Sequence, residues 1–173
     1  MLKLANLYVE KIQIKYQKIV IFNNKYKYYN YFPYWDYNIN IAKDSWNCIE
    51  MVSVDNNDHI IGLLKAEINR GSDKVSSLGI INFLEINYIF SKDLRQFIHD
   101  LFIKFNFRKI EFSVIVGNPI EKTYDKYINK YGGNIVGITH KSIKLQDNKY
   151  YDIKYYEIFR EEYIKNNKFK KEE

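Results

Sequence analysis

The side chains that most often carry catalysis are few in this chain and stand apart from one another. None of its three histidines, His59, His99 and His140, has ligand spacing with another His, Cys or carboxylate pair. Protein zinc sites are built from closely spaced ligands, so we expect no metal centre. The sequence also has no Gly-x-Ser-x-Gly elbow, no phosphate-binding Gly-rich loop and no dinucleotide fingerprint. These absences argue against the enzyme classes that such motifs mark.

Residues 118–133 hold a denser group of polar side chains. The run Asn-Pro-Ile-Glu that opens this segment is typical of a helix start, with Asn118 as the N-cap. Of the two glycines that close it, either can take the left-handed conformation that ends a helix. The helix between them carries Lys122 and Tyr124, an ammonium and a phenol. A phenol with a pKa of about 10 is able to donate a proton to a reacting group.

The tyrosine-rich segment 26–38 is a third group, in which Phe32 and Trp35 stand among tyrosines and basic residues. Basic residues with interleaved aromatics bind single-stranded nucleic acid by stacking. The simpler interpretation is ordinary core and surface tyrosine in a chain that contains 17 of them. Pro33 argues only against one continuous helix here.

Strands and one helix are expected upstream of these residues. Three strands on short polar turns, an antiparallel meander, are predicted at 46–55, 59–70 and 75–86. Residues 91–105 then place apolar side chains at helical spacing, with Ser91 as the expected N-cap. A further strand follows at 108–117, and a strand–helix–strand connection favours a parallel pair.

The ends of the chain complete the predicted fold. Residues 11–22 are expected to supply a first strand. Residues 134–145 and 150–159 are expected to form a hairpin around the turn 146–149. Together these elements predict an α/β (α+β) fold, with a mixed, mostly antiparallel central sheet flanked by helices, in one domain of residues 1–173.

Composition agrees with a single folded domain. Hydrophobic residues make up 46% of the 173 residues, and 27 Lys and Arg stand against 21 Asp and Glu. This basic excess fits either a bias toward Lys, Asn, Ile and Tyr or attraction to an anion. The single cysteine, Cys48, cannot form an intrachain disulfide. No signal peptide is recognisable and no stretch reaches the roughly 18 apolar residues of a membrane span. We therefore expect a cytoplasmic protein.

The order of elements and one local motif resemble the GNAT superfamily of N-acetyltransferases. The motif is Asn118 followed by Lys-Thr-Tyr-Asp-Lys at 122–126 and a glycine at the helix end. It is similar to the family pattern of Asn, Lys-Leu-Tyr-x-Lys and a terminal Gly-Phe. The segment 136–163 is also similar to the C-terminal hairpin of ribosomal-protein and antibiotic acetyltransferases. The resemblance covers about residues 46–163, and the first third of the chain by topology alone.

The resemblance implies transfer of acetyl from acetyl-CoA to a primary amine. Acetyl-CoA would lie where the sheet splays, between the strand ending near Glu85 and the strand ending at Gly117. The start of the first long helix would hold the pyrophosphate, although its segment IFSKDLRQF lacks the glycines that the family has there. The implied cofactor-binding residues are Leu84, Ser91, Lys92, Asp93, Leu94, Asn118 and Lys122.

The resemblance also implies catalytic residues. Tyr124 would protonate the departing coenzyme A thiolate, with Tyr127 as its substitute if the helix register is shifted. Glu85 would help to deprotonate the amine, and Glu67 is a weaker candidate for that role. Plain structural roles stay open for these residues, namely an apolar stripe for Tyr124 and a surface carboxylate for Glu85. Segment 26–38 would then wall the acceptor pocket.

A different class of function also stays open. A GNAT-like scaffold without the glycines could lack activity and instead bind a protein or nucleic-acid partner, although the resemblance does not favour nucleic acid. The sequence does not say whether the amine belongs to a small molecule or a protein. A homodimer that pairs through the long C-terminal strands is compatible with the pattern.

Overall fold

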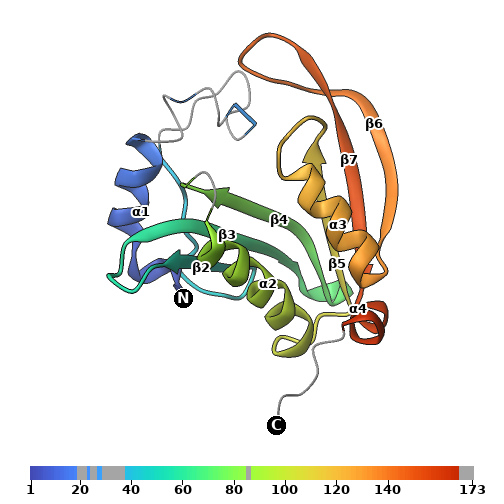
Figure 1. Ribbon diagram of the computed structural model, residues 1–173, viewed down its shortest axis with the longest axis horizontal. Helices are drawn as coiled ribbons and strands as arrows, with labels where there is room; N and C mark the ends of the chain where they lie inside the picture. Colours follow the sequence, from blue (N-terminus) through green and yellow to red (C-terminus); the bar gives the residue numbers. More distant parts are fainter. Residues whose placement is uncertain (19–22, 24–26, 29–37, 85–86, 168–173) are drawn as a thin grey trace.

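A seven-stranded mixed sheet forms the centre of the molecule (Figure 1). The computed structural model describes residues 1–18, 23, 27–28, 38–84 and 87–167. The strand order is β1-β2-β3-β4-β5-β7-β6, and among these neighbours only β4 and β5 run parallel. The strands are β1 (Leu2–Leu4), β2 (Cys48–Val54), β3 (Ile60–Asn69), β4 (Lys74–Asn82), β5 (Lys109–Ile115), β6 (Asn134–Lys144) and β7 (Tyr150–Phe159). The predicted mixed, mostly antiparallel sheet is confirmed.

Helices cover both faces of this sheet. The helices are α1 (Val9–Tyr16), α2 (Tyr88–Ile103), α3 (Glu121–Tyr131) and α4 (Arg160–Asn166), with short 3-10 turns η1 (Ala5–Leu7) and η4 (Arg70–Ser72). The larger core joins α2, α3 and α4 to one face, and a smaller core joins α1 to the other face of β2 and β3. No helix in the described part of the chain is long and apolar enough to cross a membrane.

The helix α2 connects β4 to β5 and forms the centre of the larger core. Its apolar residues Leu94, Phe97, Ile98 and Leu101 recur at helical spacing, and all four are buried. This stripe is the one that the sequence predicts, and its burial against the sheet holds the two parallel strands side by side.

The parallel pairing of β4 and β5 is short. Only Lys74 with Lys109 and Val75 with Ile110 are Cα partners, at the beginning of both strands. On its other side β5 pairs with β7 along its whole length. Beyond Val75 the two strands therefore diverge, and Figure 1 shows β4 turning away from β5. The predicted splay of the sheet is confirmed at this place.

The strand β6 forms one edge of the sheet and is irregular. Its register against β7 shifts between Ile135 and Gly137 and again between Thr139 and Ile143. Lys141, inside the second shift, has a φ of 50°. Such bulges bend and twist a strand.

One predicted element is wrong at the N-terminal side. A helix, α1, occupies 9–16, where the sequence interpretation had a strand at 11–22. Ile12 and Tyr16 lie one turn apart on α1 and are both buried against Val52 and Leu63. Helical spacing of these two side chains therefore outweighs the irregular alternation that suggested a strand. The final helix α4 was not predicted at all.

Candidate active site

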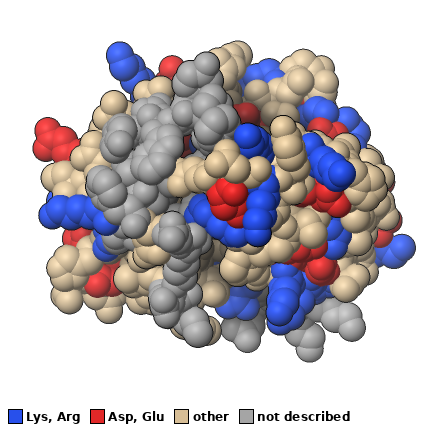
Figure 2. All heavy atoms as spheres, turned by 90° about the horizontal axis from the view of Figure 1, so that it is seen from above, with Lys and Arg blue, Asp and Glu red and all other residues tan. Residues whose placement is uncertain are grey.

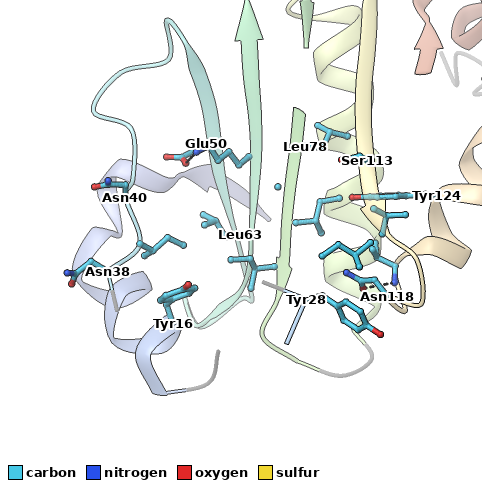
Figure 3. Close-up of a pocket in the computed structure, with 18 residues that line it drawn as sticks. Tyr16, Tyr28, Asn38, Asn40, Glu50, Leu63, Leu78, Ser113, Asn118 and Tyr124 are labelled. Carbon is cyan, nitrogen blue, oxygen red and sulfur yellow. Dashed lines mark hydrogen bonds and ion pairs between the residues drawn. The ribbon is translucent and has the colours of Figure 1, made fainter. Parts of the chain in front are cut away.

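A cavity of about 390 Å³ lies where β4 and β5 diverge. Residues 78–81 of β4, residues 113–115 of β5 and Tyr124 of α3 line one part of it. Tyr16, Asn38, Asn40 and Glu50 line another part, which lies on the opposite side in Figure 3. The cavity thus connects the gap in the sheet to the face that α1 covers.

Tyr124 projects from α3 toward the gap. Its side chain is 3% exposed, and in Figure 3 its hydroxyl end is turned toward Leu78 and Ser113. The ring packs edge-on against Phe112 at 4.7 Å and against Tyr156 at 5.8 Å between centroids. Tyr124 therefore belongs to the core and also lines the cavity, and its suggested role as a proton donor stays a prediction.

A polar network beside Tyr124 fixes α3 on β7. The Asp125 carboxylate accepts hydrogen bonds from Lys154 Nζ at 2.7 Å and from the Tyr156 hydroxyl at 2.8 Å. Burial opposes the charge of Asp125, but these two hydrogen bonds outweigh it and lower the pKa of its carboxyl. The hydrogen bond to Asp125 outweighs burial at Lys154 as well, and it raises the pKa of that ammonium. Both groups are therefore charged at neutral pH and hold Tyr124's helix in place.

Asn118 also lines the cavity, but it does not cap α3 in the predicted way. The helix begins at Glu121, and Asn118 Oδ1 accepts from the Ile120 amide at 3.2 Å. Gly117, whose φ is 92°, ends the preceding strand and donates its amide to Glu121 Oε2 at 2.9 Å. These bonds form a tight turn, which presents Asn118 at the mouth of the gap. The predicted end of the helix is confirmed, since Gly132 has a φ of 75°.

A short piece of the tyrosine-rich segment reaches this turn. The Tyr28 hydroxyl donates to the Gly117 carbonyl at 2.9 Å, and Lys27 Nζ donates to the Tyr151 hydroxyl at 3.1 Å. Tyr28 also lines the cavity. Most of segment 26–38 lies outside the described residues, so its suggested role as an acceptor wall stays a prediction.

The expected N-cap at Ser91 is wrong. The N-cap lies four residues earlier, because the Asn87 side chain accepts from the Phe90 amide at 3.1 Å and helix α2 begins at Tyr88. The Ser91 amide donates to the Asn87 carbonyl at 3.1 Å, as in the body of a helix. The four residues from Ser91 to Leu94 therefore do not offer the free amides of a first turn. Asn and Ser cap helices about equally well, so the residue types alone do not separate Asn87 from Ser91.

Two of these four residues belong to the interior. Asp93 is 6% exposed and accepts from the Ser53 hydroxyl at 2.7 Å, while Leu94 is part of the larger core. Burial of both side chains argues against their contact with a phosphate, and the expectation that Asp93 and Leu94 bind the cofactor stays a prediction. Ser91 and Lys92 are exposed on α2.

Leu84, Lys122 and Tyr127 do not line the cavity. Leu84 lies just past β4, is 40% exposed, and donates its amide to Asn82 Oδ1 at 3.0 Å. Lys122 is exposed on α3. Tyr127 packs on Tyr131 at 5.7 Å, and burial raises its pKa to about 12. Glu85 lies outside the described residues, so its suggested role as a base stays a prediction.

Several cavity residues carried no signal in the sequence. Glu50 and Lys65 face each other across β2 and β3, where they are Cα partners. Glu50 Oε2 accepts from the Ala42 amide at 2.6 Å, and Lys65 Nζ lies 3.7 Å from Glu50 Oε1. Glu67, the weaker candidate base, is more exposed and lies 3.4 Å from Lys65. Cross-strand partners such as these become visible only once the register is known.

Among the described residues potential metal ligands do not cluster, and charges of both signs are mixed on the face seen in Figure 2. No three potential metal ligands gather among the residues that the structure describes. On the face seen in Figure 2, Lys and Arg lie interspersed with Asp and Glu rather than in one continuous basic patch. On β5 and β7, Lys109 Nζ lies 2.9 Å from the Glu111 carboxylate and 2.6 Å from the Glu157 carboxylate.

Comparison with known proteins supports the same fold. No family model and no curated protein matches the sequence. A spermidine N-acetyltransferase from Vibrio cholerae, solved in complex with CoA and spermine, is 18% identical and superposes with a TM-score of 0.72 over 95% of this chain and 97% of that one. The spermidine/spermine N-acetyltransferase SpeG from Vibrio cholerae, solved with manganese ions, is 17% identical with a TM-score of 0.70 over 97% and 96%. With its splayed β4–β5 pair and its flanking helices, this chain has the fold of the GNAT superfamily of N-acetyltransferases.

Proposed function

We propose that this protein is an acetyl-CoA-dependent N-acetyltransferase that acts on a primary amine. The observation that carries the proposal is the cavity between β4 and β5. Tyr124 of α3 and residues 78–81 of β4 both line it. Acetyl-CoA is the acyl donor in this proposal, and its acetyl group enters the gap from the side of α3.

The edge of β4 provides a place for the pantetheine arm. Past Val75 this edge no longer pairs with β5, and residues 78–81 face the cavity instead. Extended ligands with amide groups bind along such an edge as an added strand does. Backbone amides at the same place can polarise the thioester carbonyl and stabilise the oxyanion that forms on attack.

The reaction is direct transfer. The neutral amine attacks the thioester carbon and a C–N bond forms. The nitrogen, now positively charged, loses one proton to a base or to water, and the C–S bond then breaks. Tyr124 gives its phenolic proton to the departing thiolate, so that free coenzyme A leaves as a thiol. Glu85 is the proposed base, and Asn118 is a proposed contact of the pantetheine arm.

The exposed side of α2 is the proposed place for the phosphates. Tyr88 and Ile89 are in the first turn of this 16-residue helix, and the positive end of the helix dipole favours an anion there. Lys92 adds an exposed positive charge one turn later, beside Ser91. The Lys122 side chain, exposed on α3, is a further proposed counter-charge.

Calorimetric titration with acetyl-CoA tests the proposal, followed by an assay of thiol release that depends on added amine. Micromolar binding and amine-dependent thiol release are expected. No binding at millimolar acetyl-CoA would contradict the enzyme proposal. The glycine-free start of α2, where Asn87 already occupies the Phe90 amide, would then favour a scaffold that binds a macromolecular partner.

A further inference from the structure

Glu50 is a buried carboxylate in the wall of the cavity. It is 7% exposed, and it is the one carboxylate among the described residues that line this cavity. Its Oε2 is occupied by the Ala42 amide at 2.6 Å. A buried carboxylate needs a nearby cation or several hydrogen bonds to remain charged.

Among the described residues, the cation nearest to Glu50 is Lys65, which lies close to a second carboxylate as well. Lys65 Nζ lies 3.7 Å from Glu50 Oε1, which is beyond hydrogen-bond distance, and it lies closer, at 3.4 Å, to Glu67 Oε1. Burial of Lys65 would lower its pKa, but neighbouring Cys48, Glu50 and Glu67 raise it, so the ammonium is charged. Lys65 is therefore shared, and Glu50 retains capacity for a further cation.

The strands place Glu50 far from the reacting end of the cavity. Tyr124 lies beside the gap at β4, whereas Glu50 belongs to β2, two strands away. Two strand spacings amount to about 10 Å, so Glu50 cannot hold the amine that attacks at the gap. Gly79, on β4 between the two, contributes no side chain, and the aliphatic stem of Lys65 lies over it, since a Cβ added at Gly79 would meet Lys65 Cβ at 3.3 Å.

We infer that Glu50 binds a second, protonated amino group of the acceptor, which makes the acceptor a dibasic amine. The inference rests on the proposed acetyl transfer and names its substrate class from the cavity itself. One amino group is acetylated at the gap, and several methylenes pass along the Lys65 stem that lies over Gly79. The other amino group completes the charge balance at Glu50, while Lys65 stays with Glu67.

The test compares three acceptors that share a five-carbon chain. Cadaverine carries a second amine at its far end, aminopentanol a hydroxyl, and aminovalerate a carboxylate. Their kcat/KM values are measured at saturating acetyl-CoA for the wild-type protein, for Glu50→Gln and for Glu10→Gln. Gln at position 50 keeps an oxygen for the Ala42 amide, and Glu10 is an exposed carboxylate of α1 that serves as the matched control.

For the wild-type protein we expect kcat/KM to be at least about tenfold higher for cadaverine than for aminopentanol, and a tenfold ratio corresponds to about 1.4 kcal/mol. This is well above the twofold advantage of having two equivalent amines. Aminovalerate should be the poorest of the three. Glu50→Gln should lower kcat/KM for cadaverine to the value for aminopentanol and should change kcat/KM for aminopentanol by less than about twofold. Glu10→Gln should change neither value.

Each other outcome overturns the inference. Equal use of cadaverine and aminopentanol, or a preference for aminovalerate, means that the far group is not a cation. Retained preference in Glu50→Gln means that another residue binds it, and an equal loss for both amines means that Glu50 serves the fold or the reaction. If acetyl-CoA binds and a different amine is acetylated, only the inference fails. If acetyl-CoA does not bind, the proposed function fails with it.

Discussion

Replacing Tyr124 by Phe separates its packing from its chemistry. The Phe ring preserves the edge contacts with Phe112 and Tyr156, which lie 4.7 Å and 5.8 Å away. Only the hydroxyl is lost, and one hydrogen bond contributes about 1 kcal/mol to stability. A proton donor in the transition state contributes about 100- to 10,000-fold in rate. At 1.36 kcal/mol per tenfold, the barrier should rise by roughly 2.7 to 5.4 kcal/mol.

The assay measures kcat by thiol release and acetyl-CoA affinity by calorimetry on the same preparations. Tyr131→Phe is the matched control, since Tyr131 is a buried tyrosine of the same helix that does not line the cavity. We expect Tyr124→Phe to lower kcat at least about 100-fold with affinity changed less than about threefold. Tyr131→Phe should keep kcat within about twofold.

Two results would refute the reasoning about Tyr124. An unchanged kcat would mean that water or another group protonates the thiolate and that Tyr124 only packs the core. An equal fall in Tyr124→Phe and Tyr131→Phe, together with lower melting temperatures, would mean that both hydroxyls support the fold.

Three further predictions concern stability. Asp125→Asn should lower the free energy of unfolding by about 1.5–3 kcal/mol at pH 7. Because folding lowers the pKa of Asp125, this contribution is present above about pH 3.9 and is lost as the pH falls through the pKa of the folded state. The denaturant midpoints of variant and wild type should therefore converge in acid. Gly133→Ala should cost about 1–3 kcal/mol in urea unfolding, since a Cβ there would lie 2.6 Å from the Glu157 carbonyl oxygen, whereas Gly137→Ala, which meets nothing within 4 Å, should stay within about 0.5 kcal/mol. Leu101→Ala should cost about 2–5 kcal/mol in the same measurement, because Leu101 is fully buried in the core and its loss leaves a cavity.

Local patterns in the sequence predict much of this fold. Alternating apolar residues between short turns gave the meander β2–β4, and the stripe on α2 and the glycine after α3 gave both central helices. The start of α2 was missed because Asn87 and Ser91 are both good caps, and the helix uses Asn87. The helix α1 was missed because its two buried residues, Ile12 and Tyr16, are too few to define a period.

The candidate site divides in the same way. Asn118 and Tyr124 stand in one local motif and could be found from it. Glu50 and Lys65 are 15 positions apart and meet only through the register of β2 and β3. Pairing of this kind depends on tertiary structure, so one sequence without a register gives no sign of it.

The irregular strand β6 has a consequence for solubility. An exposed edge of 11 residues that carries Ile135, Val136 and Ile138 on its surface is a template for pairing with other chains. The two register shifts divide this edge into short pieces, and the left-handed Lys141 places a charge in the second break. A homodimer through β6 would therefore have only a few consecutive residues to pair. Removing the extra residue Val136 should lengthen the flat edge and increase aggregation, which light scattering of concentrated samples would reveal.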